Sequence, residues 1–135
     1  MKIALFGTNF SENFNKYIQH LVHKLESEKV EIFIEESFFD YVKERLRFKN
    51  EVFTFNSHED LKDKVDILFS IGGDGTLLSA VSYIRNSNIP ILGINTGRLG
   101  FISSVAPDQI EQAVNDVLNK NYKTNRRTLL TLNTS

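Results

Sequence analysis

The residues best suited to chemistry stand together in one run, 72–76, which has the sequence Gly-Gly-Asp-Gly-Thr and lies between an apolar segment and a helical pattern. Three glycines in four positions remove the Cβ atoms that would keep a ligand away from the backbone, and they permit positive φ. The N–H groups at the start of a helix favour a phosphate. A single anion contact there contributes only about 0.3–1 kcal/mol. We therefore predict a phosphate-binding turn in which several N–H groups converge.

Asp74 places a carboxylate in the middle of this predicted turn, where its charge would repel a phosphate. That charge is explained if Asp74 holds a metal ion, or if it accepts the proton of a hydroxyl that attacks the phosphate. Such general-base help is typically worth about 10²–10⁴-fold. The rest of phosphoryl transfer is positioning and charge neutralisation, for which Mg²⁺ is the expected cation. The simpler alternative is a tight turn in which Asp74 only caps the following helix.

A second glycine-containing loop, 95–101, follows the next predicted strand. In an open α/β sheet, ligands bind outside the carboxyl ends of the strands, so both loops would line one crevice. Run 72–76 is not a Walker A loop, because no Lys-Ser/Thr pair follows its last glycine, and it does not match the dinucleotide pattern G-x-G-x-x-G. Arg98 in the second loop could reach a phosphate or pair with a surface carboxylate, and the sequence leaves both open.

The elements that must position these loops alternate between strands and helices. Strands are predicted at 3–6, 30–34, 52–55, 66–71 and 91–94, and the tail 126–135 alternates like an exposed strand. Four helices are predicted from apolar residues at helical spacing. Their apolar residues are Phe14, Ile18, Leu21, Val22 and Leu25; Phe38, Phe39, Val42 and Leu46; Leu77, Leu78, Val81 and Ile84; and Ile110, Ala113, Val114, Val117 and Leu118. Ser11, the pair Ser57 and Asp60, and Pro107 are predicted helix starts. Right-handed crossovers then imply an α/β fold, an open doubly wound and mostly parallel sheet with helices on both faces.

Composition excludes several classes of function. The 135 residues suit about one domain, and 16 Lys+Arg against 17 Asp+Glu leave a net charge of −1, so no nucleic-acid or membrane partner is expected. The absence of cysteine excludes disulfides, thiolate zinc sites and iron–sulfur clusters. His20 and His23 lack a carboxylate cluster beside them, so we predict solvent-exposed surface there and no metal site held by the protein. No apolar run approaches a membrane span of about 18 residues, and a cytoplasmic protein is expected.

The two loops together resemble the NAD kinase family. Run 72–76 is shared with diacylglycerol and sphingosine kinases, with a close variant in phosphofructokinases, whereas 93–101, Gly-Ile-Asn-Thr-Gly-Arg-Leu-Gly-Phe, is much more specific to NAD kinases. This resemblance implies transfer of the γ-phosphoryl group of ATP, or of polyphosphate, to the adenosine-ribose 2′-hydroxyl of NAD, giving NADP. It implies the NAD kinase and phosphofructokinase-like N-terminal fold, a divalent cation bound with ATP, and a full-length protein that is a homo-oligomer.

The same resemblance implies roles for individual residues. Asp74 matches the proton acceptor of the family and would contact NAD together with Gly75. Phe101 matches an aromatic residue near the NAD adenine, and Leu78 matches a neighbouring apolar contact. The phosphate and nucleotide loop would be completed by Gly72, Gly73, Thr76, Asn95, Gly97 and Arg98.

The resemblance also implies a domain division. NAD kinases have a second, all-β domain, so residues 1–125 are expected to form the α/β nucleotide-binding domain and 126–135 to begin the crossover into a C-terminal domain. We expect the 135-residue chain to have little or no kinase activity alone. Two alternatives remain: a lipid or sugar kinase relative that shares the first loop, and a non-catalytic nucleotide-binding module.

Overall fold

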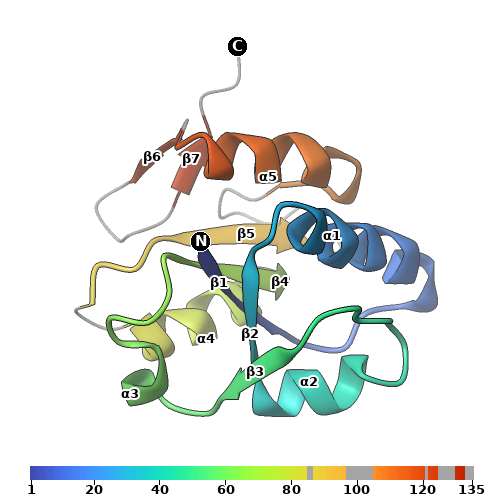
Figure 1. The fold of residues 1–135 in the computed structure, drawn as a ribbon, viewed down its shortest axis with the longest axis horizontal. Helices are drawn as coiled ribbons and strands as arrows, with labels where there is room; N and C mark the ends of the chain where they lie inside the picture. The colour runs from blue at the N-terminus through green and yellow to red at the C-terminus, as the bar shows by residue number, and fades with distance from the viewer. Residues whose placement is uncertain (85–86, 97–104, 121, 125–129, 133–135) are drawn as a thin grey trace.

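A five-stranded sheet forms the centre of the computed structural model, which describes residues 1–84, 87–96, 105–120, 122–124 and 130–132. Its strand order is β3-β2-β1-β4-β5, and every neighbouring pair is parallel. The strands are β1 (Lys2–Gly7), β2 (Glu31–Glu35), β3 (Val52–Phe55), β4 (Ile67–Gly72) and β5 (Ile91–Asn95) (Figure 1). The predicted α/β class and the five predicted strands are confirmed, with boundaries that shift by at most one residue.

Helices cover both faces of this sheet. On one face, α1 (Asn15–Ser27), α2 (Glu36–Val42) and α5 (Ile110–Leu118) bury apolar side chains against the strands. On the other face lie α3 (His58–Leu61) and α4 (Asp74–Ile84). Short 3₁₀ turns precede α1 and α5: η1 (Glu12–Phe14) and η2 (Pro107–Gln109). The sheet is therefore doubly wound, as predicted.

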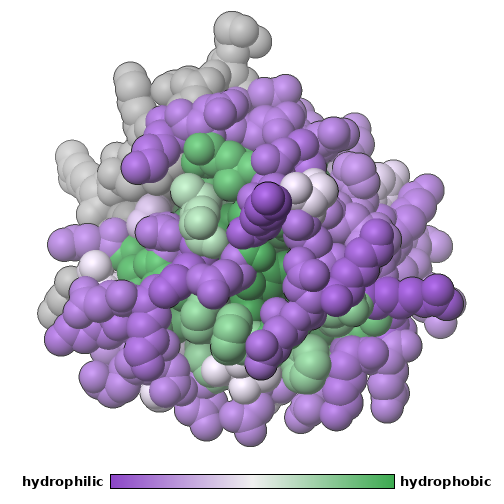
Figure 2. Space-filling model, in the orientation of Figure 1, coloured by the Kyte–Doolittle hydropathy of each residue, from purple (hydrophilic) through white to green (hydrophobic). Residues whose placement is uncertain are grey.

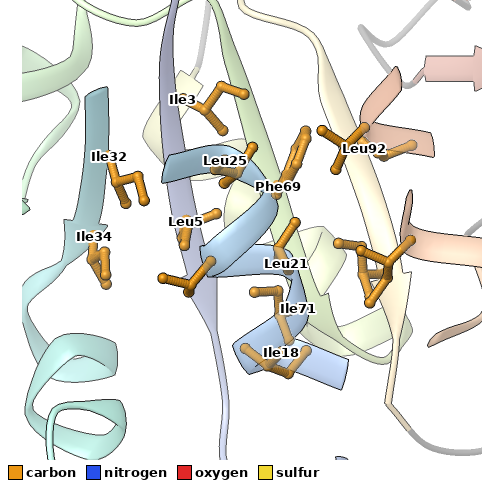
Figure 3. Packing of buried hydrophobic residues seen from close by; sticks show 14 of the residues in the cluster. Ile3, Leu5, Ile18, Leu21, Leu25, Ile32, Ile34, Phe69, Ile71 and Leu92 are labelled. Carbon is orange, nitrogen blue, oxygen red and sulfur yellow. The ribbon is translucent and has the colours of Figure 1, made fainter. Parts of the chain in front are cut away.

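Helix α1 shows how the sequence pattern produces this packing. Ile18, Leu21, Val22 and Leu25 are buried as their helical spacing predicts, and Figure 3 shows the α1 side chains over β1 and β4. The helix ends where Lys29 adopts φ 59°, and the Val30 N–H then donates to the Leu25 carbonyl at 3.0 Å. This closing bond satisfies a carbonyl that the last turn leaves unpaired and directs the chain into β2.

The predicted inner face of α4 is partly wrong. Leu77, Ala80 and Ile84 are buried, but the Leu78 side chain is 62% exposed and Val81 is 39% exposed. Both sets of residues recur at helical spacing, so periodicity alone does not choose between them. The structure places Ala80, with its small side chain, against the sheet.

The predicted helix starts are also corrected in part. Ser11 precedes η1 rather than α1, and neither Ser11 nor Ser57 makes a side-chain cap hydrogen bond. The carboxylate of Asp60 instead accepts the N–H of Asn56 at 3.0 Å. This bond satisfies a donor one residue before the predicted cap.

The last elements are two short antiparallel strands, β6 (Tyr122–Thr124) and β7 (Leu130–Leu132), and β7 lies near β5 (Figure 1). The predicted tail strand is confirmed at 130–132, whereas β6 was not predicted; 126–129 and 133–135 lie outside the described residues. Hydrophilic residues cover most of the face seen in Figure 2. Within the described ranges, no helix has the length and apolar character needed to cross a membrane.

Candidate functional site

The two predicted loops begin side by side at the carboxyl edge of the sheet. Gly72, at the end of β4, is the register partner of Asn95, at the end of β5. The N–H of Thr96 donates to the Gly72 carbonyl at 3.3 Å, which continues the pairing beyond the strands. The starts of both loops therefore share one edge, as the sequence analysis expected. Gly97, Arg98 and Phe101 lie outside the described residues.

Gly72 is a position that requires glycine. Its φ is +155°, a region that residues with a side chain rarely adopt. A Cβ atom there would also lie 2.5 Å from Thr76 Oγ1 and 2.8 Å from Thr76 Cβ. The turn thus brings the backbone against the Thr76 side chain, which is only 7% exposed.

Gly73 and Gly75 differ from Gly72, because packing does not require glycine at either position. Both are exposed, and a Cβ atom built on either would meet no atom of the described residues within 4 Å. Open space therefore lies beside the backbone on both sides of Asp74. The Gly73 carbonyl accepts the Leu77 N–H at 3.1 Å, so Gly73 immediately precedes α4 and accepts its first hydrogen bond. The first N–H groups of a helix have no acceptor within it, and such donors suit an approaching anion.

Asp74 is the first residue of α4, and its side chain is partly exposed rather than turned into the core. A carboxylate at this end of a helix interacts favourably with the helix dipole. The position suits a role in stabilising the helix and equally suits contact with a ligand in the space over Gly73 and Gly75.

One turn after Asp74, Leu78 extends the exposed side of α4. Residues four apart lie on the same face of a helix, so the exposed Leu78 shares a face of α4 with Asp74. Val81 continues the same stripe into the following turn. This face of α4 therefore presents a carboxylate and apolar side chains to solvent.

Strand order adds a feature that the sequence did not predict. The chain leaves β1 toward β2 on one side, and it leaves β4 toward β5 on the other, so the order reverses between β1 and β4. In open α/β sheets the ligand crevice lies at such a switch point. The residue after β1 is Thr8, and its Oγ1 shares a hydrogen bond of 3.0 Å with Thr76 Oγ1. Only the strand order, which the sequence does not reveal directly, could have identified Thr8.

His20 and His23 lie on the exposed side of α1, as predicted. His20 Nε2 lies 3.5 Å from Glu111 Oε2 on an exposed surface, and His23 Nε2 lies 3.0 Å from Gln19 Nε2. Among the residues with described placement, no group of three or more His, Cys, Asp or Glu residues could hold a metal ion.

Comparison with known proteins assigns the family. The family model for the ATP-NAD kinase N-terminal domain matches residues 6–122. The chain belongs to this family. It is 38% identical over 135 residues to the NAD kinase of Christiangramia forsetii and 42% identical over 132 residues to that of Flavobacterium psychrophilum. These alignments cover 100% and 98% of the chain but only 46% and 45% of the relatives, so the chain spans less than half the length of these curated relatives.

Solved structures share the fold. Yeast NADH kinase complexed with NADH matches with a TM-score of 0.75 and 19% identity, over 91% of this chain and 39% of that one. An NAD kinase from Archaeoglobus fulgidus in complex with ATP matches with a TM-score of 0.55 and 24% identity, over 89% and 38%. The ATP-NAD kinase N-terminal domain described here therefore has the fold found in those kinases.

Proposed function

We propose that the full-length protein carrying this chain is an NAD kinase. It transfers the γ-phosphoryl group of ATP, or of polyphosphate, to the 2′-hydroxyl on the adenosine ribose of NAD and releases NADP. The observation that carries the proposal is the partly exposed Asp74 at the start of α4, with open space over the glycines on either side. Membership of the ATP-NAD kinase N-terminal domain family supports the choice of substrates.

Asp74 is proposed as the proton acceptor. In phosphoryl transfer the attacking hydroxyl must lose its proton as the new P–O bond forms, and a carboxylate within hydrogen-bond reach can take it. The open space beside Gly73 and Gly75 would let phosphate oxygens approach the backbone N–H groups at the start of α4. The same turn would thus bind the transferred phosphoryl group and hold the base for the attacking oxygen.

Leu78 is proposed as an apolar contact for the adenine of NAD. The ribose 2′-hydroxyl and the base are attached to neighbouring carbons of one sugar, so a ligand with its 2′-hydroxyl at Asp74 has its base within reach of the next helical turn. Leu78 lies on that turn and is exposed. Asn95 would form part of the opposite lip, and the proposed contacts of Gly97, Arg98 and Phe101 lie outside the described residues.

A divalent cation, Mg²⁺ by preference, is proposed to enter with ATP. The part of the chain that the structure describes has no group of three acidic or histidine side chains that could hold a cation unaided. Mg²⁺ usually keeps several of its waters and is held in large part by substrate phosphates, so the cation would enter on ATP while Asp74 stays available as the proton acceptor. When bound, the cation would neutralise charge on the phosphates.

We also propose the wider organisation that the resemblance implies. Residues 1–125 would form the nucleotide-binding domain and 126–135 would lead toward a β domain. The full-length protein would act as a homo-oligomer in the cytoplasm. The 135-residue chain alone would turn over little NAD, because loss of productive positioning by itself can cost about 10²-fold.

The test is an assay of the purified full-length protein with NAD, ATP and Mg²⁺. NADP is measured with a dehydrogenase that is specific for NADP. We expect NADP to form, and polyphosphate is tested as an alternative donor. A protein that makes no NADP but phosphorylates diacylglycerol or fructose 6-phosphate under the same conditions would contradict the proposal.

A further inference from the structure

Thr8 connects the end of β1 to the first turn of α4. Its Oγ1 lies 3.0 Å from Thr76 Oγ1, and the two hydroxyl groups share a hydrogen bond between residues 68 positions apart in the chain. The backbone N–H of Thr8 also donates to the Ile71 carbonyl at 3.2 Å. Thr8 is therefore held to the end of β4 through its backbone and to α4 through its side chain.

The two hydroxyls lie beneath the turn that carries Asp74. A Cβ atom on Gly72 would lie 2.5 Å from Thr76 Oγ1 and 3.0 Å from Thr8 Oγ1, so both oxygens are close to the backbone at the start of the turn. Thr76 is two residues after Asp74 in the same turn of α4. The Thr8–Thr76 hydrogen bond therefore joins the end of β1 to the backbone segment that carries Asp74.

The loop that carries Thr8 is itself fixed at its other end. The Tyr41 hydroxyl donates to the Phe10 carbonyl at 2.7 Å, and it accepts the Phe10 N–H at 3.1 Å. The two rings also pack edge to face, with centroids 5.4 Å apart. The loop is held by β4 on one side and by α2 on the other, and these hydrogen bonds restrict the movement of Thr8.

We propose that Thr8 is a positioning residue that orients Asp74 through the Thr8–Thr76 hydrogen bond. The inference rests on the proposed function, because it concerns the geometry of the same turn. Thr8 acts on Thr76 and not on the reacting atoms. Its loss therefore lowers the turnover number and leaves NAD binding little changed, since the surface offered to the adenosine stays in place.

The experiment compares hydroxyl-removing and hydroxyl-retaining variants of the full-length protein. Thr8→Val removes the hydroxyl with little change of shape, and Thr8→Ser retains it. Thr54→Val is the matched control, because Thr54 is an exposed residue of the edge strand β3, on the far side of β1 from β4. Thr76→Val and the double variant, which combines Thr8→Val with Thr76→Val, complete a double-mutant cycle.

We expect Thr8→Val to lower kcat about tenfold with a KM for NAD within about twofold of wild type. A misplacement of a reacting group by about 1 Å can cost about 10²-fold, and the loss of one support in an otherwise intact turn costs less. Thr8→Ser restores most of the turnover. The double variant is no slower than the slower single variant, because both substitutions remove the same hydrogen bond. Calorimetric NAD stoichiometry equal to that of wild type shows that the loss is not due to unfolded protein.

Two results separate the possible failures. If wild type makes NADP and Thr8→Val is as fast as Thr54→Val, the role of Thr8 is refuted and the proposed function stands. If wild type makes no NADP, the proposed function is refuted, and the proposed positioning role of Thr8 is refuted together with it. Additive losses of kcat in the double variant would also refute the proposal that both residues act through their shared hydrogen bond. Should Thr8→Val not fold, Thr8→Ala gives the same comparison, because Thr8 is exposed and its side chain is not part of the core.

Discussion

Gly75→Ala tests whether the glycine turn exists for a ligand or only for the backbone. Gly75 is the second residue of α4 and is exposed, and no atom in the described part of the chain lies within 4 Å of the position that a Cβ atom would occupy. Alanine is favoured over glycine within a helix by about 0.5–1 kcal/mol. For a domain of this size such a gain raises the melting temperature by about 1–5 °C. Gly75→Ala should therefore make the folded protein more stable.

The same methyl group would occupy the space that we assign to the phosphate and the ribose of the ligands. We expect kcat/KM for NAD to fall at least about tenfold in the full-length protein, while thermal unfolding shows the higher melting temperature. The assays are NADP formation and a thermal unfolding scan on the same preparation. Increased stability together with an unchanged kcat/KM would refute the reasoning, because it would show that the turn serves only to start α4.

Three further outcomes follow from the geometry. Gly72→Ala should lower the free energy of unfolding by about 2–6 kcal/mol, because unfavourable φ and overpacking each contribute about 1–3 kcal/mol. Denaturant unfolding of Gly72→Ala against Gly73→Ala measures the difference. Leu78→Ser should raise the KM for NAD several-fold without lowering the melting temperature, since its side chain is 62% exposed; an unchanged KM would argue against the adenine contact. The hydrogen bond from the Asn56 N–H lowers the pKa of Asp60 below its ordinary value of 3.8. The stability that Asp60 adds relative to Asp60→Asn should therefore be present above about pH 3.8 and decline as the pH falls further. Unfolding of both proteins across pH 2–7 measures this difference.

The sequence predicted the sheet well because its strands are strongly determined locally. The β4 run is buried along its whole length, and a continuous apolar segment of that kind is typical of a strand covered on both faces. Errors arose where two local patterns agree with the sequence equally well. Leu78 and Val81 share helical spacing with Leu77 and Ile84, and only the packed structure shows which side of α4 faces the sheet.

The proposed roles of Asp74 and its neighbouring glycines rest on residue type and order, whereas their packing required the structure. Residue types and order were enough to single out Asp74 and the glycines around it. The sequence could not show that Gly72 needs its missing side chain whereas Gly73 and Gly75 do not, because that difference depends on where Thr76 packs. Thr8 was missed for the same reason. Its partner is 68 residues away, and their contact depends on β1 lying beside β4 in the sheet.

The central claim is that Asp74 accepts the proton of the attacking hydroxyl, and Asp74→Asn in the full-length protein tests it most directly. The substitution preserves the shape of the side chain and removes its basicity. We expect kcat for NADP formation to fall by about 10²–10⁴-fold while the calorimetric affinity for NAD stays within a few-fold of wild type. Wild-type turnover by the folded Asp74→Asn protein would contradict the account.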